Sequence, residues 1–576
     1  MNALQYPKRL IEVDLPIRRI SAHARREKSI RHGHISTLHI WWARRPLASC
    51  RAVICAALWP DPGTPLEPGT PPCPQAFREA AARIVADFAR RVTTEKGLGD
   101  KHCSPENWPK WTKLAQNGPL DPGNPNHMNA LRGLLLDFIA DFAIWDNSTV
   151  PAYLETARAL TQAAHEALGG EPGTRPLVVD PFAGGGSIPL EALRVGADAF
   201  ASDLNPVAVL LNKVVLEYIP KYGQRLADEV RKWGAWIKEQ AEKELAEFYP
   251  KDPDGATPIA YLWARTIRCE GPGCGAEVPL MRSLWLAKKP GRSVAMKLVP
   301  RPRAKRVDFQ IVENVRARDV GEGTVARGSA TCPVCGFTTP VASVRRQLKP
   351  RRGGAADARL FCVVTTRPAE RGRFYRLPTE RDLAAVRRAA EELERRKKAH
   401  CGEFSLVPDE PLPTSGSLGF RVQPYGMSEW GNLYAPRQAL ALTTLVGLAR
   451  RAGGLGTRET GSEIAEATQT CLALAVDRMA DKNASLTVWN TVGEKIEHVF
   501  GRQALPMTWD FPEVGIFSNS TGNWMSHVRL VAEVLGEWKG ELRTGTSLLA
   551  PASGSPMLSE SGQAVFTDPP YYDAVP

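Results

Sequence analysis

Hydrophobic residues recur at two different spacings along the chain. Over roughly the first 170 residues the spacing is helical, and loops rich in glycine, proline and asparagine separate the apolar stretches. The predicted helices are residues 46–58, 76–92, 128–145 and 153–168. We therefore expect this part of the chain to form a layer of helices.

A short apolar run, Leu177-Val178-Val179-Asp180, begins a different pattern. A glycine cluster follows, then an apolar helical stretch from Ile188 and a second apolar run over 199–203. The order strand, turn, helix, strand is typical of a parallel sheet that binds ligands at the carboxyl ends of its strands. Downstream, helices are predicted over 207–218, 225–248, 380–400, 437–451, 464–479 and 524–538, and a last strand over 564–567.

The length of the chain predicts several domains, because 576 residues exceed the size at which one hydrophobic core stops growing. The expected fold class is α/β. The predicted segments are an N-terminal domain (1–60), a linker and helical region (61–170), the first half of an α/β domain (171–255), a basic insertion with cysteines (256–400) and the rest of the α/β domain (401–576).

Composition and charge narrow the class of protein. The chain is 43% hydrophobic and lacks both an apolar run of about 18 residues and a leader pattern, so we expect a cytoplasmic protein without membrane association. The formal charge of +12 is concentrated in residues 281–360, which hold 18 Lys and Arg against 5 Asp and Glu, a net of +13. Such clustering is typical of a surface that binds a polyanion, although a solvated basic loop has the same composition.

The glycine cluster lies where the first predicted strand passes into a helix. Asp180 and Phe182 precede Gly184 and Gly186, and glycine permits positive φ and close approach of a ligand to the backbone. Asp203 ends the next strand, where its carboxylate can accept hydrogen bonds from ribose hydroxyls. A dinucleotide and S-adenosylmethionine both carry a ribose, so this pattern fits either cofactor.

The sequence Asp568-Pro569-Pro570-Tyr571 follows the last predicted strand and favours S-adenosylmethionine. Consecutive prolines remove backbone donors and leave carbonyl oxygens that accept hydrogen bonds. Asp568 and the Pro569 carbonyl would accept the hydrogens of an exocyclic amine and orient its lone pair toward a methyl sulfonium, while Tyr571 stacks on an extruded base. The predicted reaction is methyl transfer by positioning and electrostatic stabilisation. Taken alone, these four residues could form a simple turn.

Four of the eleven cysteines form two close pairs inside the basic segment. Four residues separate Cys269 from Cys274, and two separate Cys332 from Cys335. Two such knuckles complete a tetrahedral zinc site, so we predict structural Zn2+, with buried free thiols as the alternative. A zinc site here would shape a DNA-reading surface.

The motif Trp41-Trp42-Ala43-Arg44-Arg45 precedes the first predicted helix. These side chains could stack on or pair with a nucleotide. Two tryptophans before a helix more often pack in a core, which is the interpretation that we adopt.

Taken together, the motifs resemble those of the bacterial adenine-specific DNA methylases that carry a zinc ribbon and an N-terminal domain of unknown function. The resemblance runs nearly end to end, through residues 39–47, 180–186, 202–206, the cysteine pairs, 434–438, 509–511 and 568–571. It implies a Rossmann-like class I methyltransferase sheet with a helical N-terminal region and a zinc-ribbon insertion. By this similarity, S-adenosylmethionine would bind to Phe182, Gly184, Gly186 and Asp203, and the target amine to Asp568, Pro569, Pro570 and Tyr571.

The resemblance also implies a biological setting. Asp at the head of the last motif is commoner in adenine-N6 than in cytosine-N4 enzymes of this kind. Relatives often sit beside helicase, ATPase or nuclease genes, which implies restriction or anti-phage defence with DNA as the partner. The family's sheet normally continues beyond this motif, so we expect its C-terminal strands to be missing here and supplied by a second polypeptide, a downstream frame or an unsequenced end.

Two other functions stay open on the sequence. The first is an RNA amino-methyltransferase, because the same chemistry fits any exocyclic amine. The second is a zinc-dependent DNA-binding subunit whose methyltransferase half is degenerate. Methyl incorporation into DNA or RNA separates the first from the expected function, and binding of S-adenosylmethionine separates the second.

Overall fold

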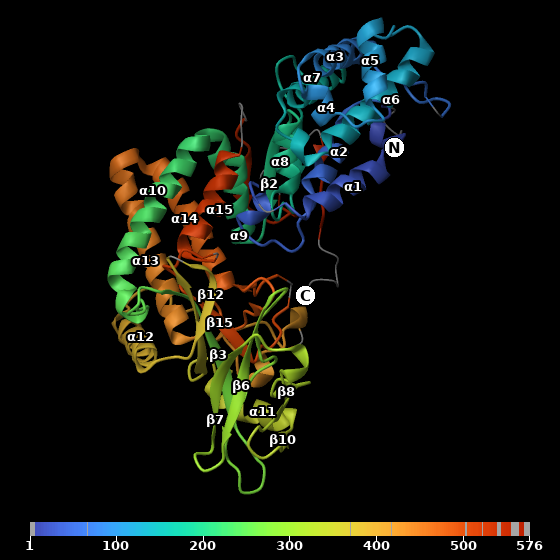
Figure 1. Ribbon diagram of the computed structural model, residues 1–576. Coiled ribbons are helices and arrows are strands. Elements are labelled where there is room, and N and C mark those ends of the chain that lie inside the picture. The colour runs from blue at the N-terminus through green and yellow to red at the C-terminus, as the bar shows by residue number, and fades with distance from the viewer. Residues whose placement is uncertain are drawn as a thin grey trace. The chain divides into compact units, whose positions relative to one another are not determined.

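The computed structural model describes residues 6–30, 32–65, 67–368, 370–415, 417–501, 504–520, 522–537, 543–554 and 564–569. The architecture is mixed α/β, with helices and several sheets (Figure 1), which confirms the expected class at this level. The chain divides into unit 1, residues 1–227 and 533–570, and unit 2, residues 228–532 and 571–576. It leaves unit 1 within helix α10 (Ile219–Leu245) and returns within helix α15 (Trp524–Gly536).

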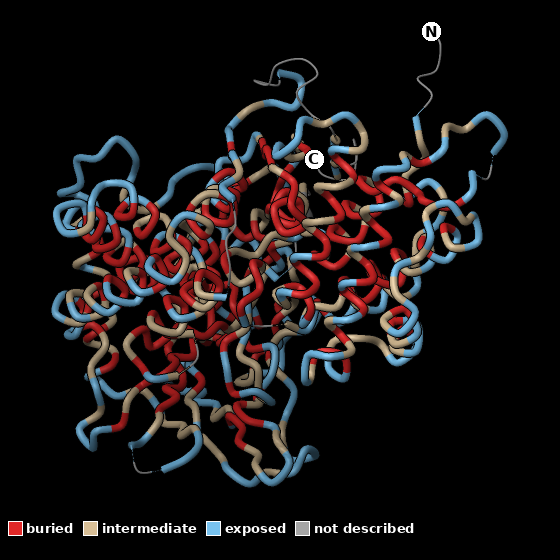
Figure 2. The backbone as a smooth tube through the Cα atoms, turned by 90° about the horizontal axis from the view of Figure 1, so that it is seen from above, coloured by how far each residue is buried: buried red, intermediate tan, exposed pale blue. Residues whose placement is uncertain are grey.

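Unit 1 begins with a layer of helices, and four of them correspond to the four stretches that the periodicity predicts. They are α1 (Ile17–Glu27), α2 (Leu47–Leu58), α3 (Gln75–Thr94), α4 (Leu98–His102), α5 (Trp108–Asn117), α6 (Pro125–Phe142) and α7 (Pro151–Ala167). The core of this layer is aromatic: the ring of Phe88 lies 5.1 Å from that of Trp111, 5.0 Å from Phe138 and 4.9 Å from Tyr153. These residues belong to the buried segments drawn red in Figure 2.

The N-terminus of α2 is held by a buried carboxylate. Glu27, at the end of α1, accepts hydrogen bonds from the backbone N–H groups of Leu47 and Ala48, both at 2.9 Å. His34 Nε2 lies 2.9 Å from Glu27 Oε1. Burial would raise the pKa of Glu27, but these hydrogen bonds hold it below its usual value. An ionised Glu27 therefore caps α2 where the helix dipole favours a negative charge.

A four-stranded parallel sheet forms the second part of unit 1. Its order is β16 (Thr546–Leu549), β2 (Asp198–Asp203), β1 (Leu177–Asp180) and β17 (Ala564–Val565). Helix α8 (Ser187–Arg194) packs against β1 and β2, and α9 (Pro206–Asn212) packs against β2 and β16. After α9 the helix widens into a π-helical stretch, Lys213–Tyr218. All four strands run in one direction, so their carboxyl ends share one edge.

Unit 2 contains a long antiparallel sheet. Its order is β12 (Glu370–Arg376), β11 (Arg359–Arg367), β3 (Thr257–Arg268) and β15 (Asp510–Val514), and β4 (Glu277–Leu280) also pairs with β3. The helices of this unit include α11 (Val341–Leu348), α12 (Glu380–Ala399), α13 (Pro436–Thr460) and α14 (Ser462–Lys482). Short strand pairs are β8 (Val325–Ala326) with β9 (Ser329–Thr331), β9 with β10 (Thr338–Thr339), and β13 (Trp489–Asn490) with β14 (Lys495–Ile496).

A buried ion pair joins the helices of unit 2 to this sheet. Arg437, in the first turn of α13, contacts Glu513 of β15 through two hydrogen bonds of 2.7 and 2.9 Å. Trp263 of β3 donates to the same carboxylate at 2.9 Å, and the guanidinium lies 4.0 Å from the ring centre of Tyr261. Every polar atom of this pair is compensated, which is the condition for burying two charges. The motif at 434–438 thus has a structural role.

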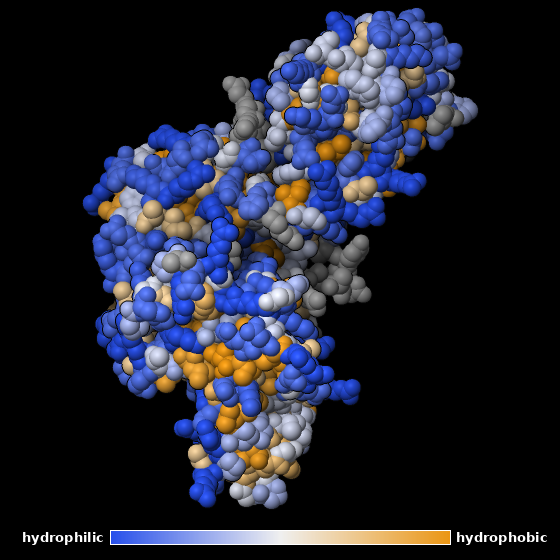
Figure 3. Space-filling model, in the orientation of Figure 1, coloured by the Kyte–Doolittle hydropathy of each residue, from blue (hydrophilic) through white to orange (hydrophobic). Residues whose placement is uncertain are grey.

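A separate antiparallel sheet carries part of the basic segment. It consists of β5 (Trp285–Lys289), β6 (Arg292–Arg301) and β7 (Arg306–Glu313), and the β6–β7 ladder extends to the pair Arg301 and Arg306. In Figure 3 hydrophilic side chains cover much of this face of the unit, with an apolar area in the region of β3 and β6. Within the described parts of the chain, no helix is both long and apolar enough to cross a membrane.

Candidate functional site

The two halves of the sequence-predicted site meet at the carboxyl edge of the parallel sheet. Strand β17 pairs with β1 in parallel, Val178 opposite Ala564 and Val179 opposite Val565, and Phe566 N–H donates to the Val179 carbonyl at 3.0 Å. Asp180 therefore ends the strand next to the one that leads to Asp568. Asp203 ends β2 on the other side of β1. Residues far apart in sequence are thus brought to one edge.

Hydrogen bonds fix the glycine loop above β1 and β2. Gly184 and Gly186 have φ values of +49° and +79°, in the left-handed region that glycine tolerates. Gly184 N–H donates to Asp203 Oδ2 at 2.9 Å, and the side-chain amide of Asn212 donates to the Gly184 carbonyl at 3.0 Å. The other Asp203 oxygen accepts the N–H of Asn205 at 2.8 Å. Asp203 therefore shapes the loop, and its remaining lone pairs stay available to a ligand.

Asp180 is buried beside two other carboxylates. Its Oδ1 accepts the Phe182 N–H at 3.1 Å. Burial, together with the negative charges of Asp203 and Asp568, raises the pKa of Asp180 to about 7. Phe182 is 38% exposed, although its side chain is apolar. The edge thus offers carboxylates and an aromatic ring to a ligand.

Residues of the Trp41–Arg45 motif lie at this edge, which sequence reasoning missed. Trp41 lies against the glycine loop: a Cβ on Gly184 would be 2.8 Å from its indole nitrogen. Arg45 contacts both carboxylate oxygens of Asp568, with Nη2 2.5 Å from Oδ1 and Nε close to Oδ2. Trp42 is 47% exposed. The interpretation of this motif as core packing is therefore wrong for Trp42.

The last motif is described only in part. Asp568 and Pro569 lie beyond β17, and the Asp568 side chain is one-third exposed. Pro570 and Tyr571 lie outside the described residues. Their predicted contacts with a base therefore stay predictions.

Unit 2 contains a second candidate site, a cluster of four cysteines. The Sγ atoms of Cys269, Cys274, Cys332 and Cys335 all lie within 4.8 Å of one another. Cys269 Sγ is 3.5 Å from Cys335 Sγ, and Cys274 Sγ is 3.9 Å from Cys332 Sγ. Four thiolates around zinc, with Zn–S bonds of about 2.3 Å, place their sulfurs about 3.8 Å apart. The cluster could bind a metal ion, and its ligands are compatible with zinc.

Both cysteine turns are closed by their own backbone. Cys269 N–H donates to the Ala276 carbonyl at 2.8 Å, and Cys332 N–H donates to Phe337 at 2.9 Å. The two turns touch at Gly271, where a Cβ would lie 2.8 Å from Phe337 Cβ and 3.2 Å from Cys335 Sγ. A glycine at this point explains how the wider first pair still reaches the second.

The end of the β6–β7 hairpin is strongly basic. Arg301, Arg303, Lys305 and Arg306 are all exposed. Asp308 pairs with Arg301 and Arg306, both at 3.0 Å. In the part of the chain that the structure describes, Arg303 and Lys305 form no ion pair. Of the four cations at the hairpin end, these two are therefore the most open to an external anion.

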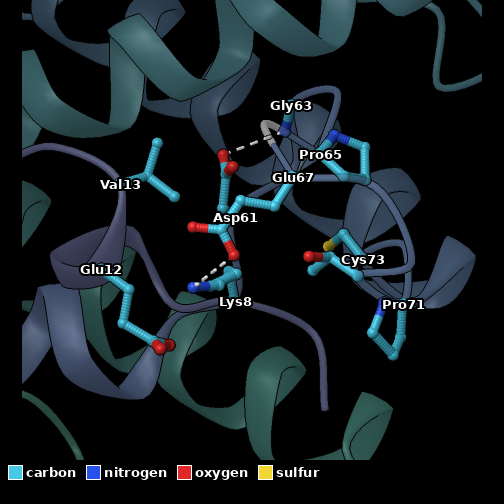
Figure 4. Close-up of a pocket in the computed structure, with 10 residues that line it drawn as sticks. Lys8, Glu12, Val13, Asp61, Gly63, Pro65, Glu67, Pro71 and Cys73 are labelled. Carbon is cyan, nitrogen blue, oxygen red and sulfur yellow. Dashed lines mark hydrogen bonds and ion pairs between the residues drawn. The ribbon is translucent and has the colours of Figure 1, made fainter. Parts of the chain in front are cut away.

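A hollow in the helical layer of unit 1 offers no comparable chemistry (Figure 4). Its charged groups bind one another: Lys8 pairs with Glu67 at 3.3 Å, and Asp61 accepts the Gly63 N–H at 3.0 Å. Arg132 binds both oxygens of Asp61 at 2.6 Å. We assign this hollow a structural role.

The cysteine cluster predicts a metal dependence. Cys332→Ser/Cys335→Ser removes two of four ligands, so we expect bound zinc to fall from about one per chain to about none, and unit 2 to lose thermal stability, because metal binding contributes to folding. Elemental analysis and calorimetry measure both quantities. The control is Cys401→Ser, which changes an exposed cysteine outside the cluster. Equal zinc content in the two variants would contradict the site.

Asp180 predicts a pH effect on stability. Its folded pKa of about 7 lies above its unfolded value, so the folded state holds the proton more tightly, and this stabilisation is present at low pH and lost as pH rises through about 7. Asp180→Asn keeps an acceptor for the Phe182 N–H but cannot titrate. We expect the thermal midpoint of the unsubstituted chain to fall more between about pH 5 and about pH 8 than that of the variant. Asp198→Asn, in β2, is the matched control, and parallel pH curves for Asp180→Asn and the unsubstituted chain would refute the prediction.

Comparison with known proteins gives one match. Residues 14–83 match the family described as "Protein of unknown function (DUF1156)", and this region includes α1, α2 and the Trp41–Arg45 motif. No curated protein and no solved structure is significantly similar to the chain.

Proposed function

We propose that the chain is an S-adenosylmethionine-dependent DNA methyltransferase that modifies adenine N6. The observation that carries this proposal is the parallel pairing of β17 with β1, which sets Asp568 at the same sheet edge as the glycine loop and Asp203. Methyl transfer requires that the residues that bind the cofactor and those that bind the amine lie in one site. We further propose restriction or anti-phage defence as the setting, on the resemblance alone.

The order of the parallel strands supports a Rossmann-like methyltransferase sheet. In chain order the strands are β1, β2, β16 and β17, and in space they lie as β16, β2, β1, β17. The sheet therefore grows outward from β1 in both directions, and such a reversal of strand order creates a crevice at the carboxyl ends, where ligands bind. Residues 228–532 of unit 2 would then be an insertion between the second and third strands.

The residues at this edge fit S-adenosylmethionine. The glycine loop comes close to the ligand space without side chains, Asp203 retains lone pairs for ribose hydroxyls, and the exposed ring of Phe182 offers an apolar face to the purine. When bound, the cofactor supplies an electrophilic methyl group on a sulfonium. The carboxylates of Asp203 and Asp568 would favour that positive charge, and Asp180 would add to the effect where pH exceeds about 7 and it is ionised.

Asp568 and Pro569 would hold the target amine. Each oxygen of a carboxylate offers two lone pairs, so Asp568 can accept an amine hydrogen while it keeps a contact to Arg45. The Pro569 carbonyl would accept the second hydrogen, which turns the nitrogen lone pair toward the methyl group. As the nitrogen becomes cationic, the Asp568 charge stabilises it.

Methyl transfer itself tests this function. With labelled S-adenosylmethionine we expect incorporation into duplex DNA rather than transfer RNA, and Asp568→Asn should lower the rate about 100-fold or more, because it removes the charge that stabilises the cationic nitrogen. Asp146→Asn changes an exposed aspartate of the same unit and is the control. Labelling of RNA alone would support the RNA enzyme, and cofactor binding without any transfer would contradict both.

The hairpin end predicts a salt effect on DNA binding. Each phosphate contact contributes about −0.9 to the slope of log affinity against log salt, so Arg303→Gln/Lys305→Gln should reduce the magnitude of the slope by about 1.8. Fluorescence anisotropy with duplex DNA measures it. The control, Lys397→Gln/Lys398→Gln, removes two exposed charges from α12. An unchanged slope in the hairpin variant would exclude the hairpin from DNA contact.

A further inference from the structure

We infer that Arg45 is a positioning residue for Asp568, so that the Trp41–Arg45 motif, within the region matched to a family of unknown function, forms part of the methyl-transfer site. This inference rests on the proposed function and adds a role for the N-terminal segment. The contact that suggests it joins Arg45 to both carboxylate oxygens of Asp568.

Among the residues that the structure describes, Asp568 has little other support. Strand β17 is two residues long, and its last backbone bond to β1 is made by Phe566, two residues before Asp568. In the described residues, Arg45 is the side chain that hydrogen-bonds the Asp568 carboxylate. A two-point contact from a planar guanidinium fixes both the position and the rotation of a carboxylate. A residue of the N-terminal segment, Arg45, therefore sets the orientation of the Asp568 carboxylate.

Arg45 is itself on a well-anchored segment. The residues that follow it enter α2, whose N-terminus is capped by the buried Glu27. Within α2, the buried Arg51 lies 3.6 Å from Glu191 of α8, the helix that begins directly after the glycine loop. On the other side of Arg45, Trp41 rests on the loop. The segment that carries Arg45 thus contacts the glycine loop and α8, the same elements that would hold the cofactor.

Electrostatics gives the contact a second effect. The carboxyl groups of Asp180, Asp203 and Asp568 lie close enough to repel one another when they are ionised, and this repulsion opposes their being held at one edge. Arg45 offsets this repulsion at Asp568 and leaves lone pairs on both oxygens for an amine. Arg45 therefore holds the Asp568 carboxylate at the sheet edge and still leaves it able to accept hydrogen bonds from an amine.

The test compares Arg45→Gln and Arg45→Lys with the control Arg26→Gln in the full chain. Arg26 forms an exposed ion pair with Asp146 at 3.0 Å, so the control removes a similar contact elsewhere in unit 1. We expect Arg45→Gln to lower kcat about 10- to 100-fold at unchanged KM for DNA, because misplacement of a catalytic group slows the chemical step. Arg45→Lys should recover part of this loss. The thermal midpoint should stay unchanged, because exposed ion pairs contribute little to stability.

Hydrogen exchange gives a readout that is independent of activity. Amides in 564–568 should exchange several-fold faster in Arg45→Gln than in Arg26→Gln, because the support of this segment is lost. Equal exchange rates in the two variants, an unchanged kcat, or a change confined to KM would each overturn the inference. A higher kcat in Arg45→Gln would also overturn it, because the contact would then be inhibitory. Absence of transfer by the unsubstituted chain would instead count against the proposed function, while the exchange measurement would still decide whether Arg45 holds Asp568.

Discussion

The parallel pairing of β1 with β17 is the interaction on which the candidate site depends. It joins Val178 to Ala564 across most of the chain, including residues 228–532 of unit 2, and it does so through a ladder of two residues. So short a ladder cannot by itself offset the entropy of closing so long a loop. Side chains such as Arg45, which contacts Asp568 in the segment beyond the strand, add to the hold on this part of the chain.

Sequence patterns predicted what is decided locally. The run at 177–180 forms β1, the glycine cluster adopts positive φ, and the charged stretch at 380–400 forms α12 behind a capping box of Thr379 and Asp382. The four cysteines converge as their spacing indicates. In each case the determining residues lie within a few positions of one another or carry a specific chemistry, so one sequence is enough.

Contacts between distant residues were not predictable in this way. Arg45 and Asp568 are 523 positions apart in the sequence. Arg437 of α13 and Glu513 of β15 are also distant in sequence and form an ion pair. Tertiary packing also overrode a local signal in α13, which was expected to end at 451 and continues to Thr460. Gly453 and Gly456 lie in this extension and face α14: a Cβ at Gly453 would lie 3.2 Å from Gln469 Cβ, and one at Gly456 would lie 3.4 Å from Ala465 Cβ. Glycines that usually end a helix here allow two helices to approach.

The cysteine cluster has a consequence for how this protein can vary. Cys274 and Cys332 are 58 positions apart, and all of β5, β6 and β7 lies between them. A metal bound there would hold together the two ends of the segment between Cys274 and Cys332. Changes in the hairpin would then not require changes in β3 or in the strands that pair with it. Hairpins of other lengths and charges could then be exchanged on a constant scaffold.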